Sequence, residues 1–387
     1  MSPSRSVALM GATGSIGTQT LEVLRREPDA FQLVSISGGT NVHELSVIAK
    51  EFNVRHIGVS NEQSATALRD LVGPDEQIEV GSKGLEVLSS SADIVVNAVM
   101  GFAGLPVTMA ALSAGKRLAL ANKESLIAAA SLVEKVRQTP GAVILPIDSE
   151  HCAIHQALAS STSQKPYPDV RKIILTASGG PFRGWSKDRL AVVTKADALA
   201  HPTWSMGPKI TIDSSTLMNK GLEVLEASAL FGIEVDRVDV VVHPQSVVHS
   251  MVEYIDGSVI AQLSMPDMRL PIAYCLGLPG RLDHAWGKLD FTSGLELTFE
   301  APDRTAFPAL DLAYSAARHG GAAPAWLSAA NEICVEAFLQ GMITWQSIVQ
   351  TVSSVMDKYV PTDISSIDEL LENDAKARQL ASAIIAK

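Results

Sequence analysis

Two carboxylates, Asp148 and Glu150, stand one residue apart directly after an apolar run at 142–147 that we predict to be a strand. If the chain stays extended, both side chains point to the same side. The carboxyl end of a parallel strand is where open α/β sheets bind ligands, and like charges this close repel unless a cation lies between them. The alternative is a helix N-terminal turn, where the helix dipole favours acids. These residues alone leave both interpretations open.

A second polar cluster, at 213–223, follows a predicted strand at 209–212. We expect 213–216 to cap a helix and Asn219, Lys220 and Glu223 to share one helical face. Such a helix start could hold a phosphate group, and Glu223 could join Asp148 and Glu150 in an all-oxygen site suited to Mg²⁺ or Mn²⁺. The alternative is an exposed, salt-bridged helix face. Gly221 lowers helix stability there, so we take it as a sign that some group approaches closely, which favours the functional interpretation.

A third pattern is the glycine-rich run 11–17, in which Gly11, Gly14 and Gly17 follow an apolar strand and precede a helical stretch. Glycines there permit a tight turn and let the backbone approach a pyrophosphate, while the helix N-terminus supplies N–H donors. The spacing is not GxGxxG, so packing alone is the competing interpretation. The position in a βαβ unit favours dinucleotide binding.

The residues at the end of the second predicted strand indicate which dinucleotide binds. NAD-specific sites place Asp or Glu there to hold the ribose hydroxyls. This chain has the run 35–41, Ser-Ile-Ser-Gly-Gly-Thr-Asn, without a carboxylate. Nothing there would repel a 2′-phosphate, which favours NADP(H). Thr40 and Asn41 can hydrogen-bond a phosphate but cannot neutralise it.

The elements that must position these residues divide the chain into parts. Strand-like and helix-like segments alternate over the first 150 residues, which predicts a parallel sheet. We expect an α/β protein with an N-terminal Rossmann-like domain at 1–148. A central α/β catalytic domain at 149–277, with a lid loop at 179–208, should follow. A hairpin with a type I′ turn at Asp256-Gly257 is expected inside it. A linker at 278–308 and a C-terminal helical bundle at 309–387 complete the prediction.

Composition limits the classes of function. The chain has 387 residues, with 31 Lys+Arg against 42 Asp+Glu and a net charge of −11. That balance argues against general binding to nucleic acid or a membrane surface. The three cysteines show no metal-ligand spacing, and no apolar run approaches a membrane span. We therefore expect a cytoplasmic protein without a thiolate zinc site.

Taken together, these stretches resemble the 1-deoxy-D-xylulose 5-phosphate reductoisomerase family. The resemblance covers nearly the whole chain and is most specific from His201 to Glu226. The matching stretches are 11–17, 121–124, 146–151, 175–183, 201–207, 213–226, 243–253 and 265–269. The family implies NADPH and Mg²⁺ or Mn²⁺ as cofactors, a homodimer, and conversion of a phosphorylated ketose to 2-C-methyl-D-erythritol 4-phosphate.

The resemblance also implies roles for the matched positions. It implies cofactor contacts at Thr13, Gly14, Ser15, Ile16, Gly39, Asn41, Asn122, Glu124, Met206 and Gly207. It implies substrate contacts at Lys123, Ser149, Glu150, Ser178, His201, Trp204, Ser214, Asn219, Lys220 and Glu223. The implied metal ligands are Asp148, Glu150 and Glu223, and the implied catalytic residues are Lys123, Glu150 and His201.

One position departs from part of the family, because Thr40 stands where some members carry a basic residue.

Two rival functions can be separated by experiment. A plain NADP-dependent dehydrogenase would not need the three acids, and an NADP(H) sensor would need neither the acids nor a phosphate site. We expect His243 and His249 to be structural or to support neighbouring site residues without taking part in catalysis, and Trp326 and Trp345 to lie in the core.

Overall fold

The computed structural model describes residues 4–161, 163, 165–204 and 206–386. Two compact units form within it. The first unit comprises Met1–Ser125, Val133–Cys152 and Asp267–Trp286, and the second comprises Leu126–Leu132, Ala153–Pro266 and Gly287–Lys387. Among the helices of this described part, none is long and apolar enough to cross a bilayer.

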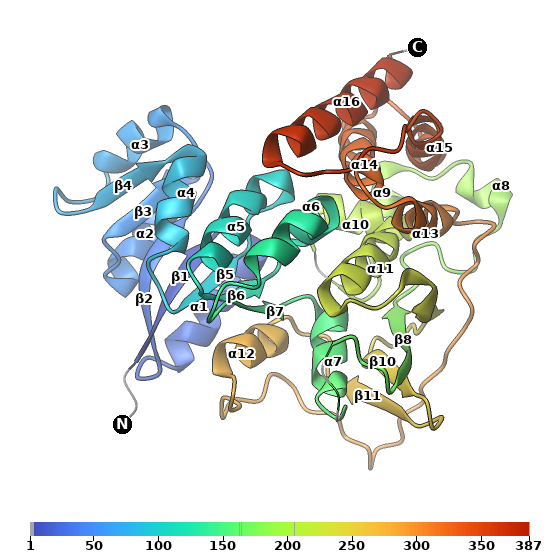
Figure 1. Cartoon of the computed structure of the whole chain (residues 1–387), viewed down its shortest axis with the longest axis horizontal. Helices are drawn as coiled ribbons and strands as arrows, with labels where there is room; N and C mark the ends of the chain where they lie inside the picture. The colour runs from blue at the N-terminus through green and yellow to red at the C-terminus, as the bar shows by residue number, and fades with distance from the viewer. Residues whose placement is uncertain (1–3, 162, 164, 205, 387) are drawn as a thin grey trace. The chain divides into compact units, whose positions relative to one another are not determined.

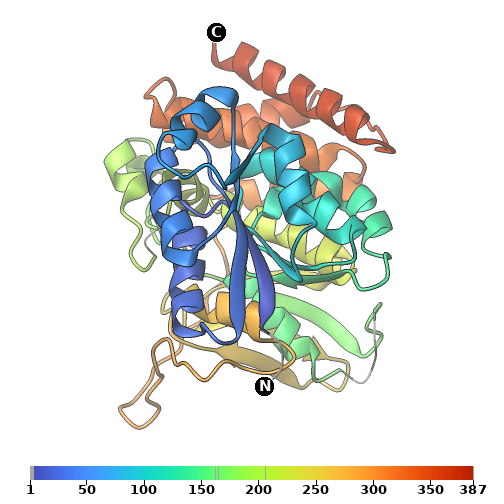
Figure 2. The same ribbon diagram turned by 90° about the vertical axis from the view of Figure 1, so that its left-hand side faces the viewer.

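The first unit is built on a seven-stranded parallel sheet with the strand order β4-β3-β2-β1-β5-β6-β7 (Figures 1 and 2). The strands are β1 Arg5–Met10, β2 Phe31–Ser37, β3 His56–Val59, β4 Gln77–Val80, β5 Ile94–Asn97, β6 Arg117–Leu120 and β7 Val143–Pro146. The central strands are apolar and buried, as a sheet covered on both faces requires. The predicted Rossmann-like parallel sheet is therefore confirmed.

Helices connect these strands. They are α1 Ser15–Arg26, α2 Val42–Phe52, α3 Glu62–Arg69, α4 Gly81–Ser89, α5 Leu105–Ser113 and α6 Lys123–Val136. Helix α7, Ser149–Leu158, follows β7 and leads to the second sheet. A short 3₁₀ turn, η1 Gly101–Gly104, precedes α5. Helix α6 is interrupted by a non-helical residue, Ala129, within the segment that belongs to the second unit.

The helix α12, Arg269–Gly277, returns to the first unit and packs against α1. Arg269 pairs with Glu22 of α1 at 2.8 Å. Trp286 is buried, and the guanidinium carbons of Arg26 and Arg269 lie 4.1 and 4.5 Å from its ring centre. The expected continuous domain at 149–277 and linker at 278–308 therefore differ from the compact units. The cause is a set of contacts between residues far apart in the chain.

The second unit contains a four-stranded sheet with the order β11-β10-β8-β9. Its strands are β8 Val170–Ala177, β9 Val238–Val242, β10 Val248–Tyr254 and β11 Val259–Leu263. The hairpin β10–β11 forms as predicted, but its turn is not type I′. A type I′ turn needs a positive φ at both central residues. Gly257 has a φ of +85°, but the φ of Asp256 is not positive, so only the glycine adopts the left-handed conformation.

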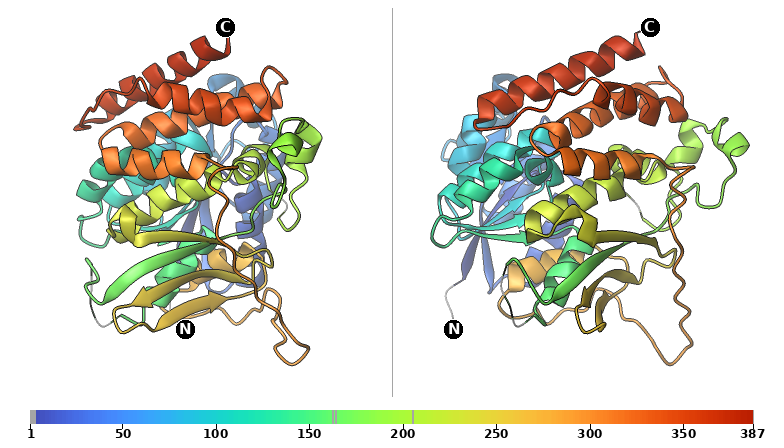
Figure 3. Two further views of the ribbon diagram at one scale, coloured as in Figure 1. Left: turned by 90° about the vertical axis from the view of Figure 1, so that its right-hand side faces the viewer. Right: turned by 45° about the vertical axis from the view of Figure 1, so that its right-hand side comes forward.

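Helices complete the second unit and lie over one face of this sheet (Figure 3). They are α8 Lys187–Leu190, α9 Lys195–Leu199, α10 Pro208–Ser215, α11 Met218–Phe231, α13 Ala309–His319, α14 Ala323–Leu339, α15 Trp345–Met356 and α16 Ile367–Ile385, with η2 Val235–Arg237. Helix α11 contacts β8 and β9 as well as α13. The predicted C-terminal helices are confirmed to within a few residues.

Candidate active site

The glycine-rich turn between β1 and α1 has no room for larger residues. Gly11 has a φ of +88°, and a Cβ built on it would lie 2.5 Å from the carbonyl oxygen of Ala98. A Cβ on Gly17 would lie 2.2 Å from the carbonyl oxygen of Gly11. Gly14 is the N-cap of α1, and no side chain caps this helix. The turn therefore combines tight packing with a helix start suited to an anion.

The loop after β2 lies beside an open hollow of about 230 Å³. Its lining is uncharged and comprises Thr40, Val42, Asn61, Gln63, Ser64 and Ala67. Asn41 caps α2 through the backbone N–H of Glu44, and its amide also donates to the Glu44 carboxylate at 2.6 Å. Asn61 and Gln63 follow β3, an element too short to stand out in the sequence, so the sequence analysis missed them.

Asn122 is buried where β6 passes into α6. Its Oδ1 atom accepts the backbone N–H of Ser125, and its Nδ2 atom donates to the carbonyl oxygens of Val99 and Gly101 at 2.8 and 2.7 Å. The same Nδ2 atom donates to Glu124 at 3.1 Å. Asn122 thus fixes the start of α6, which carries Lys123.

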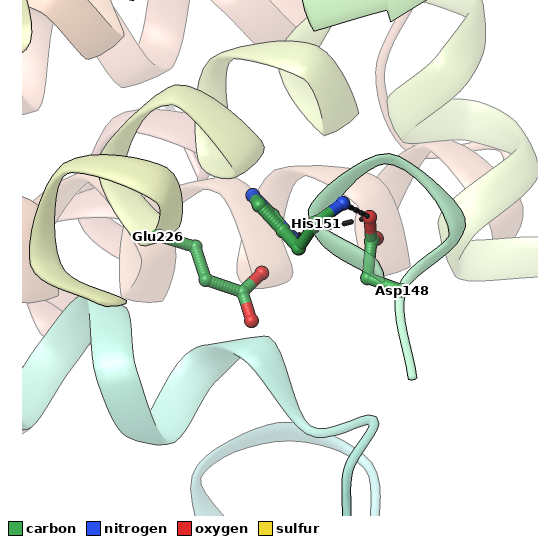
Figure 4. Close-up of side chains that lie close together, drawn as sticks. All are labelled: Asp148, His151 and Glu226. Carbon is green, nitrogen blue, oxygen red and sulfur yellow. Dashed lines mark hydrogen bonds and ion pairs between the residues drawn. The ribbon is translucent and has the colours of Figure 1, made fainter. Parts of the chain in front are cut away.

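Asp148 lies between β7 and α7 and is surrounded by donors. Its Oδ1 atom accepts the backbone N–H groups of Glu150 and His151 and lies 3.1 Å from Nδ1 of His151 (Figure 4). Its Oδ2 atom lies 3.2 Å from Nζ of Lys123. The expectation of an extended chain here is wrong, because α7 begins at Ser149. The helix-start interpretation describes the local structure, and it still leaves Asp148 and Glu150 at the carboxyl end of β7.

Around 209–218 the structure also corrects the sequence analysis. The segment predicted as a strand at 209–212 lies inside α10, and Asp213 belongs to the same helix. Residues 213–216 therefore form the end of one helix and do not cap the next. Leu217 adopts a left-handed conformation, with φ of +59°, and α11 begins at Met218 without a side-chain cap.

The polar face of α11 is confirmed. Nδ2 of Asn219 donates to Oε1 of Glu223 at 2.5 Å, and Nζ of Lys220 pairs with Oε2 of the same carboxylate. Lys220 and Glu223 are buried. The close approach expected at Gly221 is that of α13, because a Cβ there would lie 2.8 Å from Cβ of Ala313, and the functional interpretation of this glycine is wrong. This glycine serves helix packing.

Ser178 and His201 form another polar group in the second unit, besides the polar face of α11. Nε2 of His201 lies 3.1 Å from Oγ of Ser178. Its Nδ1 atom accepts the backbone N–H groups of Thr203 and Trp204 at 3.1 and 2.9 Å. Since Nδ1 is an acceptor, the proton of the neutral ring must be on Nε2, which then donates to Ser178. Burial lowers the pKa of His201, which keeps the ring neutral.

The turn after Ser178 packs directly on α10. Gly180 has a φ of +66°, and a Cβ built there would lie 2.7 Å from the carbonyl oxygen of Ser214. The second unit thus brings Ser178 and His201 together and packs their turn on the helix that carries Ser214. The predicted stretch 201–207 includes Ser205, which lies outside the described residues.

The first unit groups Lys123, Asp148 and Glu150 at the carboxyl end of its sheet. The second unit groups Asn219, Lys220 and Glu223 on one helix. The structural roles expected for His243 and Trp345 agree with their contacts: His243 accepts the N–H groups of Val247 and Val248, and Trp345 is buried. The indole of Trp345 also donates to Oγ of Ser215 at 2.9 Å, a bond across 130 positions that no local pattern predicts.

The parallel sheet with its glycine-rich first turn, and the polar groups of the second unit, define a dinucleotide-binding α/β enzyme. Family models for 1-deoxy-D-xylulose 5-phosphate reductoisomerase match residues 7–130, and models for its C-terminal domains match 144–231 and 263–380. The chain belongs to the 1-deoxy-D-xylulose 5-phosphate reductoisomerase family.

Individual relatives agree over the full length. The chain is 49% identical to the 1-deoxy-D-xylulose 5-phosphate reductoisomerase of Xanthomonas axonopodis pv. citri, over 100% of this chain and 98% of the relative. It is 46% identical to that of Citrifermentans bemidjiense, over 98% and 99%. A solved structure of the Zymomonas mobilis enzyme in complex with NADPH is 42% identical, with a TM-score of 0.91 and 99% of each chain covered. A DOX-P reductoisomerase structure in complex with NADPH, fosmidomycin and magnesium is 41% identical, with a TM-score of 0.91, covering 99% of this chain and 98% of that one.

The protonation of His201 is testable. Because burial lowers its pKa, the neutral ring stabilises the fold fully above the ordinary value of 6.5, and this contribution is lost as the pH falls through the lower folded-state pKa. We expect the imidazole NMR signal that disappears in His201→Gln to titrate with a midpoint below 6.5. A midpoint at or above 6.5 would contradict the assigned tautomer and its hydrogen bonds.

Proposed function

We propose that this chain rearranges and reduces 1-deoxy-D-xylulose 5-phosphate to 2-C-methyl-D-erythritol 4-phosphate, with NADPH and a divalent metal ion, in the non-mevalonate route to isoprenoid precursors. The observation that carries the proposal is the set of carboxylates and lysines at the carboxyl end of a dinucleotide-binding sheet and on α11. Lys123 contacts Asp148 in the first unit, and Lys220 contacts Glu223 in the second. The family relationship supports the same activity.

Asp148, Glu150 and Glu223 are the proposed metal ligands. Carboxylate oxygens are the donors that Mg²⁺ and Mn²⁺ prefer, so the donor set fits either ion. When bound, the ion acts as a Lewis acid toward the oxygens of the ketose. Nζ of Lys123 lies 3.2 Å from one carboxylate oxygen of Asp148, and the backbone N–H groups of Glu150 and His151 donate to the other. We assign Lys123, Glu150 and His201 to the chemistry at the substrate.

The proposed cofactor contacts follow the edge of the first sheet and continue on the lid. Thr13, Gly14, Ser15 and Ile16 surround the uncapped start of α1, which suits a pyrophosphate. The other proposed contacts are Gly39, Asn41, Asn122, Glu124, Met206 and Gly207. NADPH supplies the hydride that reduces the rearranged aldehyde.

The second unit is the proposed phosphate side of the substrate site. Ser178, Ser214, Asn219 and Lys220 offer hydroxyl, amide and ammonium donors, and Ser149 in the first unit is assigned to a substrate hydroxyl. His201 and Trp204 belong to the segment 179–208, which we propose to act as a lid that excludes water from the reacting atoms. The phosphate, remote from the reacting carbons, supplies binding energy and orientation.

The direct test follows NADPH absorbance at 340 nm on addition of 1-deoxy-D-xylulose 5-phosphate, after chelation and after return of Mg²⁺ or Mn²⁺. We expect oxidation that needs both the substrate and the metal. Glu223→Gln should lower turnover by at least about a hundredfold and leave NADPH binding within twofold, since it removes only a ligand charge. The matched control is Glu253→Gln, because Glu253 faces Arg171 and Lys172 on the second sheet.

Two outcomes would count against this assignment. Oxidation that ignores the metal would indicate a plain dehydrogenase, and no oxidation by a folded, NADPH-binding protein would indicate a sensor. Turnover that survives in Glu223→Gln would remove Glu223 from the metal ligands.

The uncharged hollow beside Thr40 should make discrimination between NADPH and NADH modest. Hydroxyl and amide groups can bond a 2′-phosphate, but no lining side chain carries a positive charge. We expect Thr40→Arg to raise the ratio of NADPH to NADH affinity about tenfold, because a guanidinium pairs with phosphate. Fluorescence titration of both cofactors measures the ratio, with Thr40→Gln as the uncharged control. An equal gain in Thr40→Gln would contradict the charge argument.

We also propose a homodimer in the cytoplasm. β11 is an edge strand of the four-stranded sheet, so its outer side has unpaired backbone groups that a second copy can bond. Light scattering should therefore give twice the chain mass of 41.0 kDa. A monomer mass at micromolar concentration would contradict this. The three cysteines are buried and form no disulfide within the described part of the chain, which accords with a reducing compartment.

A further inference from the structure

The last turn of α10 is tied to the C-terminal helices by a buried carboxylate. Asp213 is 1% exposed, and its Oδ1 atom accepts a hydrogen bond of 2.7 Å from Nδ2 of Asn331 on α14. Its Oδ2 atom lies 2.8 Å from Nζ of Lys209, one turn earlier on α10. Asn331 is fully buried. A buried carboxylate must be paired and hydrogen-bonded, so Asn331 supplies a bond that the fold needs.

A second tie comes from α15. The indole Nε1 of Trp345 donates to Oγ of Ser215 at 2.9 Å, and both side chains are buried. Asp213 and Ser215 are the chain neighbours of Ser214. Successive residues of an α-helix are turned by about 100°, so these two bonds hold α10 on either side of Ser214. They fix the rotation of the helix about its axis and therefore the direction in which Ser214 points.

The exposure of residues 211–227 shows which side chains the orientation of α10 leaves accessible. Every residue from Thr211 to Ala227 is buried except Ser214 and Asn219, which are partly exposed. These two residues are the proposed phosphate contacts on α10 and α11. A rotation of α10 about its axis would turn the Ser214 hydroxyl away from this partly exposed position.

We propose that Asn331 is a positioning residue for the substrate phosphate, acting through Asp213 on the orientation of Ser214. The inference rests on the proposed function, because Ser214 is assigned to the phosphate there. Asn331 donates to Asp213 through its amide, so its role depends on the hydrogen bond and not on side-chain volume. The C-terminal helical region thereby takes part in substrate recognition without contacting the substrate.

The test uses variants of the full-length protein that alter this bond. Asn331→Asp places a second carboxylate against Asp213. Asn331→Ala removes the hydrogen-bond donor without changing the charge. The exchange Asp213→Asn with Asn331→Asp restores one carboxylate and one amide with the direction of donation reversed. Asn373→Ala is the matched control, because Asn373 is also a buried asparagine of the C-terminal helices, bonded to Trp326 at 3.1 Å.

Steady-state kinetics and phosphate competition provide the measurements. We expect Asn331→Asp and Asn331→Ala to raise both KM for 1-deoxy-D-xylulose 5-phosphate and the inhibition constant of inorganic phosphate about tenfold, since small misplacements of binding groups have effects of this size. The values of kcat and of KM for NADPH should change by less than twofold. The exchange variant should recover most of the loss. Asn373→Ala should lower Tm without moving the phosphate constants.

Several results would overturn the inference. One is unchanged phosphate inhibition in both Asn331 variants. Another is an equal change in Asn373→Ala at a similar loss of Tm, which would assign Asn331 a merely structural role. If Asn331→Asp does not fold, Asn331→Ala and the exchange variant decide. A wild-type protein without metal-dependent NADPH oxidation would instead overturn the proposed function, which separates the two failures.

Discussion

Buried negative charge is the constraint on which the rest of this structure depends. Asp148, Asp213 and Glu223 are all largely removed from water, and removing a carboxylate from water is costly unless a cation and hydrogen bonds compensate it. Each has a lysine within its own unit: Lys123 at 3.2 Å from Asp148, Lys209 at 2.8 Å from Asp213, and Lys220 beside Glu223. Two of these pairs lie within single helices, α10 and α11, and the third joins the first residue of α6 to the residue before α7. The acids proposed for metal binding and the acid that orients α10 follow the same rule.

The break between α10 and α11 shows a second consequence. Leu217 has a left-handed backbone, which costs a non-glycine residue on the order of 1 kcal/mol and persists only where the surroundings enforce it. Its side chain is buried, and the bonds of Asp213 and Ser215 hold the preceding turn. The break separates Ser214 from Asn219, so two short helical faces can each present one donor. A continuous helix would turn residues five positions apart by about 140° from each other.

Local patterns in the sequence predicted what local physics determines. The glycines at 11–17, the parallel sheet, the C-terminal helices and the grouping of Asn219, Lys220 and Glu223 all follow from spacing and packing within one element. The failures concern contacts between distant residues. Segment 209–216 is polar enough to suggest a strand end and a cap, yet α14 and α15 stabilise it as a helix. Gly221 suggested a functional contact because nothing in the neighbouring sequence shows that Ala313 of α13 packs against it. The bond from Asn331 to Asp213 spans 118 positions, and no sequence period encodes it.

The net charge of −11 has the same sign as the two phosphorylated molecules that the protein is proposed to bind. The like sign is no obstacle, because screening limits the reach of surface charge to about 8 Å at physiological ionic strength. Recognition then depends on the groups that touch the phosphate. At α1 the proposed groups are backbone N–H groups at an uncapped helix start, and in the second unit the proposed groups are Ser178, Ser214, Asn219 and Lys220. Most of these donors are neutral, so phosphate binding depends on how their N–H and O–H groups are oriented. At Ser214 the buried hydrogen bonds of Asp213 and Ser215 set this orientation. A basic protein surface would add attraction without orientation, whereas this fold uses buried charge to fix orientation and leaves the surface acidic.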